Sequence, residues 1–226
     1  MALRDGLGVG RPILGGRMGN ALKGGDMTGS QKAALPHKEA LLRSGAKLFY
    51  DYGFHGTTVD AVLADAGVPK GSFYHHFGSK DVFGQAVLDR YMAFQRDLLA
   101  KWSSKKNLST PDRLVGYAKD MAQMFVKSGY QRGCLAGKFS TEVAATSDVF
   151  RDQLSFHIEA WTTQVAALLA TGQEQGDVRT DRSAQEIAEA VLSLIQGTFV
   201  LALSTRDKHT LATLVTTLLL LVEPPA

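Results

Sequence analysis

The chain has 226 residues, of which 45% are hydrophobic, and its formal net charge is only +3. This composition is typical of a soluble globular protein and excludes wholesale disorder. The single cysteine, Cys134, excludes an intramolecular disulfide. A reducing cytoplasm is therefore the expected compartment.

The excess positive charge is confined to the first part of the chain. Residues 1–90 carry 11 Lys/Arg against 8 Asp/Glu, whereas residues 91–226 carry 14 of each. A site for nucleic-acid phosphates is therefore expected before residue 90. No secretory signal is visible, and the most apolar stretch, from Leu211 to Val222, is too short to span a bilayer. We expect no membrane partner.

Residues 1–35 contain nine glycines, and five Lys/Arg against two Asp/Glu. Such a segment buries too little apolar surface to offset the cost of ordering, so a disordered leader is expected. Met18 or Met27 within it could also begin the protein. The alternative is a basic arm that touches DNA.

The remainder predicts an all-α fold of nine helices, because apolar residues recur at helical spacing and strict strand-like alternation is absent. Pro36 suits a first helical turn, Gly53 a C-cap, and Gly67 the break after a second helix that Thr57 begins. Ser79 and the Ser183–Glu186 capping box mark two later N-termini. The expected helices are 36–53, 57–66, 69–77, 79–104, 110–129, 133–146, 147–172, 184–203 and 208–222.

The segment from Thr57 to Lys80 reads TTVDAVLADAGVPKGSFYHHFGSK. Two short helices joined by a tight glycine-containing turn predict a helix-turn-helix, whose second helix enters the DNA major groove. The run from Gly67 to Lys80 resembles the N-terminal signature of the TetR repressor family. This resemblance implies a DNA-binding domain at 36–80 and an effector-sensing and dimerisation domain at 81–226.

Within this motif, Gly71 would let the second helix approach the DNA backbone, and the polar side chains around it would contact bases or phosphates. Phe73 and Phe77 are spaced to lie inward, as core. His75 and His76 point about 100° apart on a helix, so they do not predict a shared metal. The expected DNA contacts are Thr57, Thr58, Lys70, Gly71, Ser72, Tyr74, His75, His76 and Lys80.

Residues 129–143, GYQRGCLAGKFSTEV, are similar to the Gly-Cys-Leu segment of a TetR subgroup. That subgroup includes the N-ethylmaleimide-responsive and the acrylate-responsive repressors, and in the first the matching cysteine senses electrophiles and hypochlorous acid. The resemblance implies such a role for Cys134. The partner lysine of that repressor is missing, because Leu203 occupies its position here. Oxidation, alkylation and non-covalent ligand binding all remain open.

The local chemistry favours a reactive thiol, because Cys134 stands at a helix start with Arg132 before it and Lys138 one turn after it. The alternative is that Cys134 is an inert, small buried hydrophobe. A ligand pocket is expected among the middle helices, lined by Tyr117, Met121, Met124, Phe125, Phe139, Phe156, Trp161 and Phe199.

The last two predicted helices are more apolar than a solvated surface tolerates. Packed against their copies they would form a four-helix bundle, which predicts a homodimer. The expected interface is Val191, Leu194, Ile195, Leu211, Leu214, Val215, Leu218 and Leu219. No nucleophile–base pair, metal-ligand spacing or phosphate loop is present, so neither an enzyme nor a cofactor is expected.

Overall fold

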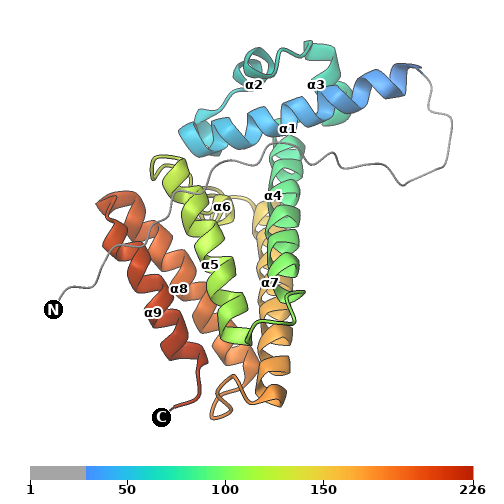
Figure 1. The fold of residues 1–226 in the computed structure, drawn as a ribbon. Helices are drawn as coiled ribbons and strands as arrows, with labels where there is room; N and C mark the ends of the chain where they lie inside the picture. Colours follow the sequence, from blue (N-terminus) through green and yellow to red (C-terminus); the bar gives the residue numbers. More distant parts are fainter. Residues whose placement is uncertain (1–28, 226) are drawn as a thin grey trace, which may run out of the picture.

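The computed structural model describes residues 29–225. Over this range the chain forms nine helices and no strand, which confirms the all-α prediction (Figure 1). They are α1 Gly29–Gly56, α2 Val59–Ala66, α3 Lys70–His76, α4 Lys80–Ser103, α5 Thr110–Lys127, α6 Leu135–Glu142, α7 Asp148–Gln175, α8 Ala184–Thr205 and α9 Lys208–Val222.

Helix α1 departs from the expectation at both ends. It begins at Gly29, so residues 29–35 are helical instead of belonging to a leader, and residues 1–28 lie outside the described part of the chain. Pro36 lies inside the helix at an exposed position, where water can satisfy the carbonyl that lacks a partner. Gly53 was expected to end the helix, and the helical backbone does break there, with φ 78° and ψ 173°. A short helical stretch then continues to Gly56.

Helices α1, α2 and α3 pack together at one end of α4 (Figure 1). Phe73 and Phe77 of α3 are buried against Phe83 of α4, with ring centroids 5.1 and 4.9 Å from it. Their predicted core role is confirmed. Gly45 lets α1 approach closely, since a Cβ there would meet the Phe83 ring at 2.4 Å. The aromatic core thus fixes α3 relative to α4.

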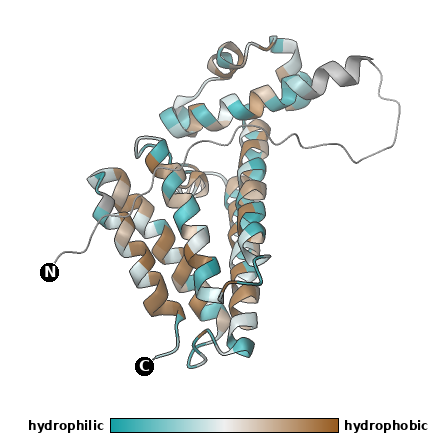
Figure 2. Cartoon of the chain, viewed as in Figure 1, coloured by the Kyte–Doolittle hydropathy of each residue, from teal (hydrophilic) through white to brown (hydrophobic). Residues whose placement is uncertain are grey.

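The other helices form a bundle around α8, which packs between α7 and α9 (Figure 1). Figure 2 shows hydrophobic residues concentrated along α8 and α9. By length and composition alone α8 could cross a membrane. In this fold it is a core helix, because Val191, Ile195 and Phe199 are buried against its neighbours.

The helix caps agree with most of the expected boundaries. Ser79 accepts a hydrogen bond from the Val82 N–H, and Ser183 and Glu186 form the predicted capping box. Two N-caps differ by one residue: Thr58 instead of Thr57 caps α2, and Ser109 instead of Thr110 caps α5.

Candidate functional site

The surface formed by α2 and α3 carries polar side chains that point away from the core. The Lys70 side chain is 65% exposed and lies 3.6 Å from the Asp60 carboxylate on α2. An ion pair this exposed contributes little to stability, so a phosphate can displace the carboxylate at small cost. Lys70 is therefore well placed to contact DNA.

Gly71, Tyr74 and His75 are exposed on α3. A Cβ built at Gly71 would meet nothing within 4 Å, so no packing inside the chain requires a glycine there. Tyr74 is 49% exposed, although its ring edge contacts Phe73. These positions can contact a surface that lies outside the chain.

Three further predicted DNA contacts are partly engaged inside the protein. The Ser72 hydroxyl lies 3.1 Å from Nδ1 of His37 on α1, and the His76 ring is half-buried beside His75. The Thr58 hydroxyl accepts a hydrogen bond from the Ala61 N–H. Its own proton remains available to an outside acceptor.

Thr57 and Lys80 are placed differently from the expectation. The Thr57 side chain is buried and its hydroxyl donates to the Leu48 and Gly53 carbonyls, so it holds the turn after α1 and cannot reach a phosphate. The Lys80 ammonium lies 4.6 Å from the Phe54 ring centroid and 3.4 Å from the His55 carbonyl oxygen. Burial lowers the pKa of Lys80.

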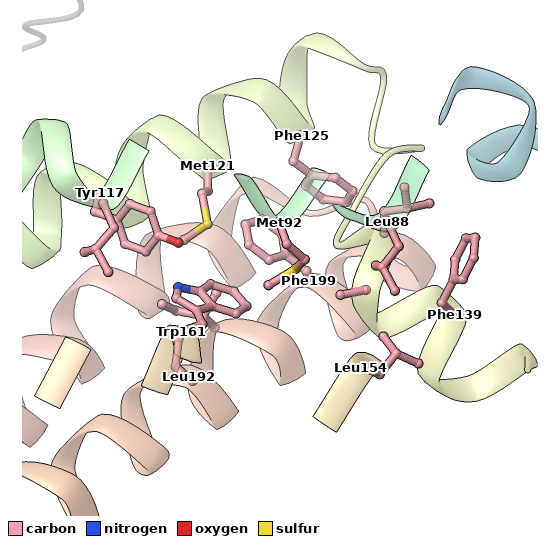
Figure 3. Close-up of a cluster of buried hydrophobic side chains, with 14 of the residues drawn as sticks. Leu88, Met92, Tyr117, Met121, Phe125, Phe139, Leu154, Trp161, Leu192 and Phe199 are labelled. Carbon is pink, nitrogen blue, oxygen red and sulfur yellow. The ribbon is translucent and has the colours of Figure 1, made fainter. Parts of the chain in front are cut away.

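A cavity of about 310 Å³ lies between α4, α5, α7 and α8, beside Cys134. Its wall is largely aromatic and thioether, and Figure 3 shows Met121, Phe125, Trp161 and Phe199 converging on one region. A second hollow of about 310 Å³ is also lined by Cys134 and includes Lys138 and Leu203. Cys134 is half-buried and lines both hollows. The first cavity is lined by Tyr50, Tyr91, Phe94, Gln95, Met121, Met124, Phe125, Lys127, Ser128, Arg132, Gly133, Cys134, Trp161, Ile195, Gln196 and Phe199.

Three hydrogen-bond donors converge on the Cys134 sulfur. The Tyr91 hydroxyl of α4 donates at 3.4 Å, the Gln196 amide of α8 at 3.2 Å, and the Gly137 N–H of α6 at 3.4 Å. Cys134 is also the N-cap residue of α6. In each of these three bonds the sulfur is the acceptor.

The two cations expected to activate the thiol are engaged elsewhere. Arg132 lies 3.7 Å from the Asp51 carboxylate, and the Lys138 ammonium donates to the Tyr50 carbonyl at 2.6 Å. Both partners belong to α1, because α6 packs across the end of that helix. Neutral donors, and not these cations, contact the sulfur.

The predicted pocket residues divide into three groups. Met121, Met124, Phe125, Trp161 and Phe199 line the cavity, as expected. Tyr117 is fully buried behind the wall and donates to the Gln95 side-chain oxygen at 3.2 Å. It does not line the cavity, so the expectation was wrong for Tyr117, and it was also wrong for two further residues. Phe139 is buried among Phe49, Phe54 and Phe150, whereas Phe156 is 66% exposed on α7.

Helix α6 also binds the end of α1. The Glu142 carboxylate accepts the Phe54 N–H at 2.9 Å and the His55 N–H at 2.7 Å. The Tyr50 hydroxyl donates to the Gly133 carbonyl at 3.2 Å. One short helix therefore carries the cysteine at its start and holds the helix-turn-helix domain near its end.

The predicted interface residues lie mostly inside the protomer. Leu194, Val215 and Leu219 are half-buried, and the others are at most 8% exposed: Val191, Ile195, Leu211, Leu214 and Leu218. They fill the protomer's own core because α8 packs against α7 and α9 within one chain. The exposed apolar residues of α8 and α9 are instead Val200, Leu201, Leu203 and Leu220.

Sequence reasoning missed Tyr91, Gln95 and Gln196 as neighbours of the cysteine, and Glu142 as a link to α1. No sequence pattern marks the Tyr91 hydroxyl as a hydrogen-bond donor to the sulfur. Glu142 lies inside the 129–143 segment, yet its partners are 87 and 88 residues away. No local pattern indicates such contacts.

Comparison with known proteins identifies the family of this chain. A family model of bacterial regulatory proteins of the tetR family matches residues 41–87, and a tetracycline-repressor-like C-terminal domain matches residues 110–218. The transcriptional regulator AcuR of Cereibacter sphaeroides is 33% identical over 162 residues, which cover 72% of this chain and 74% of AcuR. The repressor NemR of Escherichia coli is 34% identical over 139 residues, 62% of this chain and 68% of NemR.

The crystal structure of the reduced form of E. coli NemR superposes with a TM-score of 0.76 at 28% identity, covering 84% of this chain and 98% of that one. The matches cover the helix-turn-helix and most of the helical bundle. The chain belongs to the TetR family and is a DNA-binding transcriptional regulator, not an enzyme.

Proposed function

We propose that this protein is a repressor that leaves its operator when Cys134 is modified. The convergence of three donors on the Cys134 sulfur, beside a cavity of about 310 Å³, carries this proposal. The donors hold the sulfur in place at the cavity wall, and the cavity gives a small molecule access to it. The reduced form in which E. coli NemR was crystallised suits a family branch that responds to redox or thiol chemistry.

The reaction with a maleimide illustrates the chemistry. The sulfur attacks one carbon of the ring double bond and forms an S–C bond. The π electrons move to the neighbouring carbon, which takes a proton from water. The adduct fills space beside Cys134, and the sulfur becomes a thioether. The bonds from Tyr91, Gln196 and Gly137 then have only a weak acceptor.

The consequence reaches the DNA-binding part through α6. Cys134 caps the start of this helix, and Glu142 near its end accepts two backbone N–H groups of the α1 terminus. Packed helices shift as units when one contact changes. A displaced α6 therefore reorients α1 and with it the α2–α3 surface.

The DNA contacts are proposed to come from Thr58, Gly71, Ser72, Tyr74, His75 and His76, with Lys70 on a phosphate or base and Lys80 near the backbone. A homodimer would place two such surfaces on two half-sites about 34–36 Å apart, or a multiple of that distance. We assign its interface to the exposed apolar residues of α8 and α9, Val200, Leu201, Leu203 and Leu220. Operator DNA lies in the cytoplasm, where this protein would act.

A second candidate function is release by a non-covalent ligand, with Cys134 inert. The aromatic and methionine wall favours it, because such a wall suits an apolar molecule. N-ethylsuccinimide separates the two functions, since it has nearly the shape of N-ethylmaleimide but no reactive double bond.

The test is a gel shift on the operator with wild type and Cys134→Ser, after treatment with each compound. Covalent sensing predicts that N-ethylmaleimide releases only the wild type and that N-ethylsuccinimide releases neither protein, with intact mass confirming one adduct per chain. Release of both proteins by both compounds would establish the non-covalent function instead.

A further inference from the structure

A directed chain of hydrogen bonds ends at the Cys134 sulfur. The Tyr117 hydroxyl donates to the Gln95 side-chain oxygen at 3.2 Å, and the Gln95 amide nitrogen donates to the Tyr91 hydroxyl oxygen at 2.7 Å. The Tyr91 hydroxyl then donates to the sulfur at 3.4 Å. Tyr117 and Gln95 are buried, so water competes little with this chain. Hydrogen bonds in series polarise one another and strengthen the last one.

Gln95 determines the direction of the chain. Its nitrogen faces Tyr91, which makes the Tyr91 oxygen an acceptor and leaves the single Tyr91 proton to point at the sulfur. The opposite side-chain orientation would place the Gln95 oxygen against Tyr91. The tyrosine proton would then go to Gln95, and the sulfur would have to supply a proton of its own. In the observed direction the sulfur accepts the Tyr91 proton.

We infer that Tyr91 is the positioning residue that controls the reactivity of the Cys134 sulfur by donating a hydrogen bond to it, and that Gln95 and Tyr117 orient its hydroxyl for this purpose. The inference rests on the proposed reactivity of Cys134 and extends it, because it assigns the control of that reactivity to neutral residues. Gln196 and Gly137 supply the other two donors.

The tyrosine remains a donor at neutral pH. Burial, reinforced by the neighbouring Cys134, raises the pKa of Tyr91 well above its ordinary value. Burial likewise raises the pKa of Tyr117. The other ionisable groups that face the cavity are Tyr50 on α1, Lys127 at the end of α5, and Arg132, which lies beside Asp51. Lys138, on the far side of Cys134, binds the Tyr50 carbonyl.

The experiment measures the alkylation rate of Cys134 by iodoacetamide from pH 5 to 10 in full-length protein. Sulfur displaces iodide, an S–C bond forms as the C–I bond breaks, and the thiol proton goes to water. In Tyr91→Phe we expect a rate about tenfold lower at pH 7, because a hydrogen bond to a charged group is lost. The half-maximal rate should move to higher pH, while the high-pH plateau stays near that of wild type. A merely structural defect would lower the plateau instead.

Tyr130→Phe is the matched control. It also removes one phenolic hydroxyl near this region, but that hydroxyl has no hydrogen-bond partner and Tyr130 does not line the cavity. Its pH profile should equal that of wild type. Gln95→Glu keeps Tyr91 and the side-chain size but offers only acceptors when ionised, so it should draw the Tyr91 proton away and slow alkylation too. This variant decides the matter if Tyr91→Phe does not fold.

The inference would be overturned if folded Tyr91→Phe gave the same pH profile of alkylation as wild type. If Tyr91→Phe does not fold, a wild-type profile in Gln95→Glu would overturn it. The readout is independent of DNA. A slowed alkylation in Tyr91→Phe combined with a wild type that keeps its operator when alkylated would support the role of Tyr91 and refute the proposed sensing function.

Discussion

The α3 surface and the Cys134 cavity satisfy their polar groups in opposite ways. On α3, Tyr74 and His75 are exposed, and a side chain at Gly71 would contact nothing within the protein. In the cavity, donors from α4, α6 and α8 meet at one sulfur atom. The first surface is arranged for a partner outside the chain, whereas the second organises one atom inside it. On α3, substitution of an exposed residue should therefore change DNA binding without changing the stability of the fold. Around Cys134, substitution of a donor should change the reactivity of the thiol without changing the stability of the fold.

The largest expected effect tests whether the apolar residues of α8 and α9 serve two roles, some in the core of the protomer and others at a dimer interface. Leu218 is fully buried and Leu220 is 76% exposed on the same helix. Leu218→Asp should unfold the protein, at a cost on the order of 5 kcal/mol, because it removes core packing and buries an unpaired charge. Leu220→Asp should leave the melting temperature near that of wild type and weaken the dimer. Calorimetry and sedimentation measure the two outcomes, and an unchanged dimer in Leu220→Asp would place the interface elsewhere.

Two adjacent residues of α3, one buried and one exposed, test whether stability and DNA binding depend on different side chains. Phe73 is fully buried, so Phe73→Ala should cost about 3–5 kcal/mol and destabilise the helix-turn-helix. Tyr74→Ala should change stability by less than about 1 kcal/mol while weakening operator binding, as is usual for exposed positions. Circular dichroism melts and gel shifts measure both. A Tyr74→Ala protein that binds the operator like wild type would remove this side chain from the interface.

The link between the two regions is tested at Glu142. Glu142→Gln keeps the side-chain size but replaces a carboxylate that accepts two backbone N–H groups of α1. A loss of about 2 kcal/mol is expected from weakened charge-assisted bonds. Alkylation of Cys134 should proceed at the wild-type rate, whereas operator release by the adduct should be altered. Thr141→Ser, an exposed change beside it, serves as the control. Normal release in Glu142→Gln would mean that α6 signals by another route.

The smallest effect concerns two lysines. Lys70→Met should lower the salt dependence of operator binding by about one counterion, as expected for a lost phosphate contact. Lys80→Met should lower it by less, because the Lys80 ammonium lies over the Phe54 ring and near the His55 carbonyl. Binding isotherms over a range of salt concentrations give both slopes. A steeper loss for Lys80 than for Lys70 would reverse these assignments.

Much of the fold could be predicted because helix ends depend on neighbours in sequence. Ser79, Gly67 and the Ser183–Glu186 box act within four residues, and each marks a helix end in the structure. Gly172 failed as a stop for α7 because it is buried in tight contact with Val178, and the left-handed C-cap is Gly176. Such a packing requirement is invisible to local pattern.

The candidate site was predictable only in part for the same reason. The placement of Cys134 at a helix start follows from nearby residues, and the structure confirms it. Its partners Tyr91 and Gln196 are 43 and 62 residues away, so only the packing of three helices brings them together. Most of the expected interface residues lie in the core of the protomer, because an apolar α8 is equally consistent with a core helix and with a dimer surface. Burial, which the pattern does not report, distinguishes them.

The most direct test of the account is one titration of the operator-bound wild type with N-ethylmaleimide. Intact-mass measurement gives the fraction of chains modified at Cys134, and fluorescence anisotropy of labelled operator gives the fraction released in the same sample. The account predicts that release rises in step with modification and is absent in Cys134→Ser. Complete modification of Cys134 with the operator still bound would contradict it.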